Sequence, residues 1–164
     1  MKKLYLLRHA KSSWDDANLA DFERPLNDRG ERTAPFMGKF MRENSFEPSI
    51  IISSPAVRAK QTAVLVKEAA DYPCELRFDD RIYEASPRTL LQVVSEIDAT
   101  HQTTMLVGHN PGMEAFICLL TGDLESMPTA ALAVIDMEID AWNKIGEGCG
   151  QLRNIFRPKE LTSS

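Results

Sequence analysis

Cysteine is scarce in this chain, and its few cysteines are not arranged for disulfide or zinc chemistry. The three are far apart and lack CxxC spacing: Cys74, Cys118 and Cys149. An odd number of widely separated cysteines predicts reduced thiols and favours a cytoplasmic protein. Long apolar runs are missing as well. Only four apolar residues precede Arg8 at the N-terminus, and no segment approaches the roughly 20 that a membrane-spanning helix needs, so we expect no membrane partner.

Basic residues do not form runs longer than two. The chain of 164 residues has 19 Lys and Arg against 24 Asp and Glu, a net charge of −5. A nucleic-acid partner is therefore not expected, because such proteins present a basic face. Against the acidic background, the positive charge of Arg8, Lys11, Arg24 and Arg58 favours a focused anion pocket.

Several catalytic motifs are absent. There is no GxxxxGK(S/T) or GxGxxG loop, which disfavours ATP hydrolysis and dinucleotide binding. There is no GxSxG, and no cysteine lies beside the arginine-rich segments, which disfavours serine and cysteine hydrolases. With three histidines in all, clustered metal ligands are not expected, and we predict no metal and no cofactor. An imidazole nucleophile remains, because neighbouring cations can keep a histidine nitrogen deprotonated for attack on phosphorus.

Apolar periodicity predicts an α/β fold. Strands are predicted over 3–7, 50–52, 74–78, 105–107, 131–138 and 151–156. Helices are predicted from Asp28, whose spacing to Glu31 resembles a capping box, and over 56–70, 90–97 and 113–120, while Pro35 leaves the course of the first helix open. The alternation predicts a three-layer sandwich, a mostly parallel central sheet with helices on both faces, closed by an antiparallel pair. We expect one catalytic domain over 1–157 and a frayed tail over 158–164.

Chemically active residues follow three of these strands. Arg8 and His9 follow the first, Ser54 and Arg58 the second, and His109 the strand at 105–107. Since ligands bind outside the carboxyl ends of parallel strands, these groups predict a site for a dianionic phosphoryl group.

The two later strand ends share a second pattern. Ser54-Pro55 and Asn110-Pro111 each place a favoured N-cap residue before proline. They predict helices that begin at the prolines and direct free N–H groups to the same sheet edge, with Arg58 in the first turn.

Four sequence blocks resemble those of the histidine phosphatase superfamily: LRHAKS at 7–12, RPLNDRG at 24–30, SSPAVRAKQT at 53–62 and VGHNPG at 107–112. The small size, and Ala10 where the superfamily more often has glycine, resemble its SixA-like phosphohistidine phosphatase branch. The resemblance implies a phosphoglycerate mutase-like fold.

The resemblance also implies site roles. His9 would be the nucleophile, and Arg8, Arg58 and His109 would complete the phosphate pocket. Glu84 is the candidate general acid, with a helix cap or a solvated carboxylate as the alternative.

Three further residues are weaker candidates for binding substrate. Arg24 would lie at the pocket rim or bond a phosphate oxygen, unless it pairs with Asp21 or Asp28. Asn110 belongs to the last of the four blocks. Lys11 lies two residues after His9, with a solvated side chain as its alternative.

The sequence thus predicts a phosphatase that forms a phosphohistidine intermediate. Protein phosphohistidine is the expected substrate, because little sequence remains between the motifs to build a lid and the site should be open. The alternatives are a phosphatase of small phosphomonoesters such as sugar phosphates, or a non-catalytic phosphate-binding module. The expected partner is accordingly a phosphorylated protein or a small phosphorylated substrate.

Overall fold

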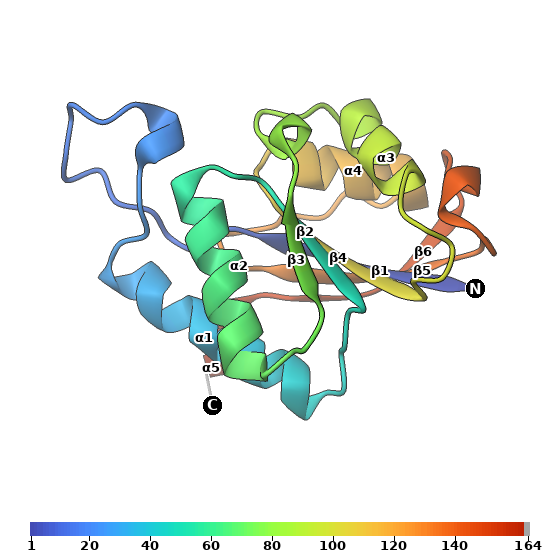
Figure 1. The fold of residues 1–164 in the computed structure, drawn as a ribbon, viewed down its shortest axis with the longest axis horizontal. Helices are drawn as coiled ribbons and strands as arrows, with labels where there is room; N and C mark the ends of the chain where they lie inside the picture. Colours follow the sequence, from blue (N-terminus) through green and yellow to red (C-terminus); the bar gives the residue numbers. More distant parts are fainter. Residues whose placement is uncertain (163–164) are drawn as a thin grey trace.

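A six-stranded mixed sheet forms the centre of the computed structural model, which describes residues 1–162 (Figure 1). The strands are β1 (Lys2–Arg8), β2 (Ile50–Ser53), β3 (Glu75–Phe78), β4 (Thr103–Gly108), β5 (Leu132–Met137) and β6 (Gly150–Phe156). Their order is β3-β2-β4-β1-β5-β6. The pairs β3–β2, β2–β4 and β4–β1 are parallel, whereas β5 runs antiparallel to both β1 and β6. The mostly parallel sheet with a closing antiparallel pair is therefore confirmed.

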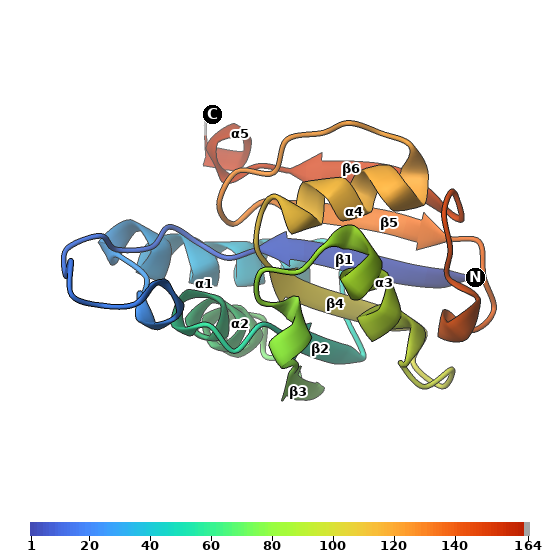
Figure 2. The same cartoon turned by 90° about the horizontal axis from the view of Figure 1, so that it is seen from above.

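Helices cover both faces of this sheet (Figure 2). The helices are α1 (Asp28–Glu43), α2 (Val57–Ala70), α3 (Pro87–Ser95), α4 (Gly112–Thr121) and the short α5 (Pro158–Thr162). Three 3-10 turns, η1 (Asp21–Glu23), η2 (Asp80–Ile82) and η3 (Trp142–Lys144), complete the elements. Helices α1 and α2 pack on one face, and α3 and α4 on the other, which confirms the three-layer sandwich.

The alternation of β1 divides the core into two layers. Leu4 and Leu6 are fully buried in the cluster that includes α3 and α4, whereas Tyr5 and Leu7 are buried in the cluster that includes α1 and α2. Successive side chains of a strand point to opposite faces. The four consecutive apolar residues of β1, at 4–7, must therefore be covered on both sides, and β1 is central for this reason.

One helix cap and two helix starts differ from the sequence prediction. Helix α1 is capped by Asn27, whose side chain accepts from the Gly30 N–H, so the predicted cap at Asp28 is wrong by one residue, and the helix continues through Pro35. The starts predicted at the prolines after Ser54 and Asn110 are also wrong. Helix α2 begins at Val57 and α4 at Gly112.

The C-terminal segment also differs from its prediction. Residues 158–162 form α5, not a frayed tail. Pro158 stands at the first helical position, which its fixed φ favours. Leu161 packs against the core, and the preceding Arg157 binds Glu125 and the Ser126 carbonyl. Ser163 and Ser164, the rest of the predicted tail, lie outside the described residues.

No helix within residues 1–162 is both long enough and apolar enough to cross a membrane.

Candidate active site

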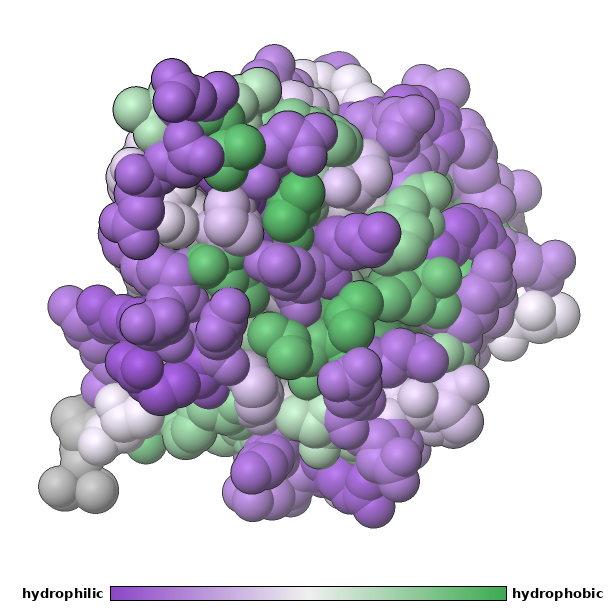
Figure 3. Space-filling model, turned by 60° about the vertical axis from the view of Figure 1, so that its left-hand side comes forward, coloured by the Kyte–Doolittle hydropathy of each residue, from purple (hydrophilic) through white to green (hydrophobic). Residues whose placement is uncertain are grey.

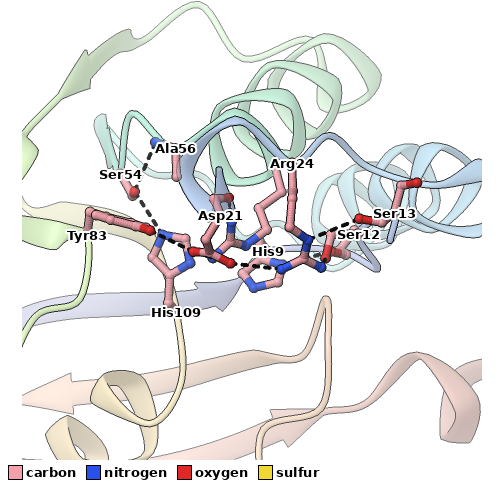
Figure 4. A network of polar contacts seen from close by, with 11 residues as sticks. His9, Ser12, Ser13, Asp21, Arg24, Ser54, Ala56, Tyr83 and His109 are labelled. Carbon is pink, nitrogen blue, oxygen red and sulfur yellow. Dashed lines mark hydrogen bonds and ion pairs between the residues drawn. The ribbon is translucent and has the colours of Figure 1, made fainter. Parts of the chain in front are cut away.

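Three strand ends meet at one edge of the sheet and bring two imidazoles together. His9 follows β1, and its N–H donates to the Gly108 carbonyl at 3.0 Å, next to His109. Ser54 follows β2, and its N–H donates to the Val107 carbonyl at 3.0 Å. The ring centroids of His9 and His109 are 5.1 Å apart (Figure 4).

The His9 ring is held in one tautomer. Its Nδ1 lies 2.8 Å from the Ala10 carbonyl oxygen. A carbonyl only accepts hydrogen bonds, so Nδ1 carries the proton and Nε2 of the neutral ring keeps a free lone pair. Burial, reinforced by the neighbouring His109 and Arg58, lowers the pKa of His9 to about 3. At neutral pH this imidazole is therefore uncharged.

His109 lies in a comparable environment. Its Nε2 is 2.8 Å from Ser54 Oγ, which also accepts from the Ala56 N–H. Burial, and then the charge of Arg58, lower the pKa of His109 to about 4. Its Nδ1 is buried and has no hydrogen-bond partner within residues 1–162. Ser54 thus fixes the His109 ring where the sequence predicted only a helix cap.

Asp21 joins two arginines and a tyrosine at this site (Figure 4). Arg58 donates from Nη1 to the Asp21 carbonyl at 2.7 Å and from Nη2 to Oδ2 at 2.9 Å. Arg24 donates to Oδ1 at 2.9 Å, and the Tyr83 hydroxyl donates to Oδ2 at 2.6 Å. The Tyr83 hydroxyl, followed by the two guanidiniums, holds the pKa of Asp21 well below its usual range. Asp21 is therefore an anion at neutral pH and not a proton donor.

Arg24 is almost fully engaged by the loop after His9. It donates to the Ser13 carbonyl at 3.0 Å and to Ser12 Oγ at 2.5 Å, and its guanidinium stacks on the exposed Trp14 ring. Of the two acidic partners considered from the sequence, Asp21 is the one it binds.

The Arg8 guanidinium forms a hydrogen bond through Nη1, while its Nε has no partner in the described part of the chain. Its Nη1 donates to the Met127 carbonyl at 3.0 Å, whereas its buried Nε has no partner among residues 1–162. Burial lowers the pKa of Arg8, partly offset by Glu114. An anion bound beside His9 would supply an acceptor for this Nε.

Asn110 serves the local fold. Its Nδ2 donates to Glu114 Oε2 at 2.8 Å and to the Met127 carbonyl at 2.9 Å. Both amide hydrogens are thus engaged within the protein, and this arrangement does not favour the predicted substrate contact.

Glu84 and Lys11 are both exposed. Glu84 adopts a left-handed φ of 54° and lies close enough to Tyr83 to affect the tyrosine electrostatically. The Tyr83 ring meets the His109 ring edge-on, with 5.5 Å between the centroids, and Glu84 follows Tyr83 in the chain. The Lys11 side chain lines a different cavity beside α1 and α5, so the structure does not place it in the cluster.

The sequence did not identify Tyr83 or Thr62. Thr62 Oγ1 accepts from the Ala10 N–H and donates to the Arg58 carbonyl, which ties the His9 segment to α2. Thr62 ends the SSPAVRAKQT block, four residues after Arg58 on the same helix, and this spacing could have revealed it. Nothing in the residues around Tyr83 indicates a contact with Asp21, 62 positions earlier in the chain.

Residues 1–162 contain no group of three or more His, Cys, Asp and Glu side chains that could hold a metal ion.

Comparison with known proteins identifies relatives of this site. Residues 4–90 match the model of the histidine phosphatase superfamily (branch 1). An uncharacterized protein of Mycobacterium tuberculosis is 30% identical over 164 residues, which cover 93% of this chain and 100% of that protein. A crystal structure from Agrobacterium tumefaciens, assigned as the phosphohistidine phosphatase SixA, is 30% identical and covers 96% of this chain and 98% of its own, with a TM-score of 0.82. The mycobacterial glucosyl-3-phosphoglycerate phosphatase shares the fold at 16% identity and a TM-score of 0.68, over 92% and 96% of the two chains.

Proposed function

We propose a specific reaction for this chain, which belongs to the histidine phosphatase superfamily: it hydrolyses protein phosphohistidine through a covalent phosphohistidine on His9, without a metal ion. The state of His9 is the observation that carries this proposal. Nδ1 is held by the Ala10 carbonyl, and the pKa of about 3 keeps the ring neutral, so Nε2 is available to attack phosphorus.

The surrounding cations suit the charge of the transferred group. Arg58 and Arg8 have guanidinium donors that can bind phosphoryl oxygens as charge develops on them. His109 lies 5.1 Å from His9 between ring centroids, which is near enough to contact the same group. A bare phosphate-binding module would not need a neutral imidazole with a directed lone pair, so this arrangement favours catalysis.

The reaction then has two displacements. His9 Nε2 attacks phosphorus, a new P–N bond forms, and the bond between phosphorus and the substrate imidazole breaks as that imidazole takes up a proton from solvent. Water next attacks the phosphorus on His9 and releases a proton to solvent, which balances the proton taken up in the first step. The P–N bond breaks, inorganic phosphate leaves, and the neutral His9 is restored.

The choice of substrate class is supported by two features. Phosphohistidine leaves as an imidazole, which needs no strong acid, and the acidic candidate suggested by the resemblance, Glu84, is exposed, while Asp21 is ionised. The similarity to a SixA structure at 30% identity points the same way. The expected open site is not observed, because His9 is 6% and His109 9% exposed. A substrate must therefore project its phosphoryl group inward, as a phosphorylated side chain can.

A small-molecule phosphomonoesterase is the second candidate. In that reaction Glu84, next to Tyr83 in the chain, would protonate the alkoxide leaving group, and the shared fold of the glucosyl-3-phosphoglycerate phosphatase is compatible with it.

Trapping and a substrate panel test the proposal together. Brief reaction with a labelled phosphohistidine peptide should give an adduct that is stable to alkali and labile to acid, as a P–N bond is. His9→Ala should abolish it, and His101→Ala, outside the cluster, should not.

Phosphohistidine peptides, phosphoserine peptides and sugar phosphates are then compared with and without a chelator. An adduct in His9→Ala, a preference for sugar phosphates, or activity that a divalent cation must restore would each contradict one part of the proposal.

A further inference from the structure

A second basic cavity lies beside the candidate active site. Its volume is about 440 Å³, and its lining residues come from α1, from α5 and the residue before it, from the 128–129 segment and from the start of the loop after β1. They are Lys11, Arg29, Thr33, Pro128, Thr129, Arg157, Pro158, Lys159 and Glu160. Four of the nine are cationic and one is acidic, in a chain whose net charge is −5.

The cavity shares a wall with the His9 site. Ala130 donates its N–H to the His9 carbonyl at 3.0 Å, and Met127 accepts from Arg8. The two residues between them, Pro128 and Thr129, line the cavity. The first and last residues of the segment 127–130 thus contact Arg8 and His9, and its two middle residues line the basic cavity.

Close packing of α1 fixes the opposite wall. A Cβ at Gly30 would lie 2.2 Å from the Lys11 carbonyl oxygen, so the first turn of α1 rests directly on the chain that leaves His9. Because of this contact, Arg29 of α1 and Lys11 of the loop after β1 line the same cavity.

Most of the positive charge here is not neutralised. Arg157 is paired with Glu125 at 3.1 Å and with Glu160 at 3.4 Å. Lys11, Arg29 and Lys159, in contrast, form no ion pair within the described part of the chain.

The basic surface continues beyond this cavity. An adjoining cavity of about 270 Å³ shares Arg29 and Lys159 and adds Arg32. On the face shown in Figure 3, strongly hydrophilic residues gather at the lower left, while apolar residues form a strip across the centre.

We propose that this basic surface docks aspartate and glutamate side chains of a protein substrate whose phosphoryl group reaches His9, an inference that rests on the proposed phosphohistidine phosphatase activity. The cations are spread along α1 and α5 over two adjoining cavities, and do not converge on one point as they would around a single phosphate. The backbone of 127–130 lies between them and His9. A protein surface can contact both places at once, and rim charges of this kind govern encounter and selectivity.

Matched peptides test the selectivity. One carries phosphohistidine flanked by glutamates, and the other has glutamine at every glutamate. The natural chain should hydrolyse the glutamate peptide with the higher kcat/KM. Arg29→Glu or Lys159→Glu should lower kcat/KM for this peptide about fivefold relative to the glutamine peptide, whereas Lys39→Glu, the same charge change on exposed α1 surface, should not. Equal ratios in all variants would overturn the proposal.

A binding measurement that does not depend on catalysis separates the docking proposal from the proposed phosphatase activity. Fluorescence anisotropy of a labelled oligoglutamate peptide should show binding at low salt that Arg29→Glu and Lys159→Glu weaken and Lys39→Glu does not. Such binding supports the docking surface even if no phosphohistidine peptide is hydrolysed, in which case only the proposed activity fails. No binding, or displacement by inorganic phosphate as effective as by unlabelled oligoglutamate, would overturn the docking proposal.

Discussion

We expect the proposed binding of phosphoryl oxygens by Arg58 to depend on the planar geometry of its guanidinium and not only on its charge. It presents two nitrogens to Asp21 and keeps further N–H donors for phosphoryl oxygens. Lysine can offer a positive charge but no planar pair of donors. We expect Arg58→Ala to reduce kcat about 10²–10³-fold, as for loss of one transition-state contact, and Arg58→Lys to remain well below the natural enzyme. Steady-state kinetics on a phosphohistidine peptide measures both, and near-normal turnover of Arg58→Ala would place this arginine outside the pocket.

Asp21 places a negative charge beside Arg58 and Arg24, where the proposed phosphorylated substrate would bring another. Its carboxylate is ionised and forms ion pairs with both Arg58 and Arg24. Asp21→Asn keeps the size of the side chain and removes the charge, so inorganic phosphate should inhibit about fivefold more strongly, by relief of like-charge repulsion. At the same time kcat should fall, because the amide holds the Arg58 fork less firmly. An unchanged inhibition constant for phosphate would show that Asp21 acts only as a structural link.

Glu84 distinguishes the two candidate substrates. Expulsion of an alkoxide needs a proton donor, and general acid catalysis contributes about 10²–10⁴-fold. Glu84→Gln should therefore impair hydrolysis of alkyl phosphomonoesters while sparing phosphohistidine and phosphoramidate. Kinetics of one variant on both substrate types provides an internal control. Equal losses on both would assign Glu84 a structural role in its left-handed turn.

The sequence located the strand-end residues of the site but not the loop residues that hold them. His9, His109 and Arg58 could be predicted because strand ends and helix starts follow from apolar periodicity. Asp21 comes from a polar loop with no periodicity, and its contact with Arg58 spans 37 positions. Such a contact depends on how the loop folds back, which no local pattern encodes.

At the scale of elements, the order of helices and strands was predictable and their ends were not. Ser54 and Asn110 were predicted to cap helices that begin at the next residue, but α2 begins at Val57 and α4 at Gly112. Asn110 Oδ1 still accepts from the Glu114 N–H in the first turn of α4. Ser54 Oγ binds the Ala56 N–H and His109 instead. The start of a helix depends on a few hydrogen bonds that competing side chains can redirect, whereas its existence depends on a whole apolar face.

The packing of α1 against α2 permits no side chain at Gly38. A Cβ there would lie 2.6 Å from the Val66 carbonyl oxygen and 3.0 Å from the Ala69 Cβ. Alanine has the better helix propensity, by about 1 kcal/mol, but the clash with backbone outweighs it. Gly38→Ala should lower the free energy of unfolding by about 1–3 kcal/mol in urea titrations. Lys39→Ala on the exposed side of the same helix is the control, and an unchanged Gly38→Ala would mean that the two helices can separate at little cost.

At the scale of the whole molecule, the neutral imidazoles couple catalysis to acid stability. The pKa values of His9 and His109 are about 3 and about 4 in the folded chain, against 6.5 when exposed. Between these values the unfolded chain binds protons that the folded chain does not. The free energy of unfolding therefore rises with pH in this window. The contribution of the two neutral histidines is fully present above about pH 6.5 and is lost as the pH falls. The burial that keeps His9 neutral, as the proposed reaction requires, thus reduces the stability of the fold in acid.

Urea unfolding measured between about pH 7 and about pH 5 tests this coupling. Each of the two histidines should cost up to about 1.4 kcal/mol of unfolding free energy for every pH unit below 6.5. Replacing His9 by glutamine removes one of these groups, so the loss of stability on acidification should become shallower by up to that amount, and the same holds for His109→Gln. His101→Gln, outside the cluster, should keep the full dependence. If the natural chain and His9→Gln lost stability in parallel, His9 would be protonated as readily in the folded chain as in the unfolded one, and it could not be the neutral nucleophile that the reaction requires.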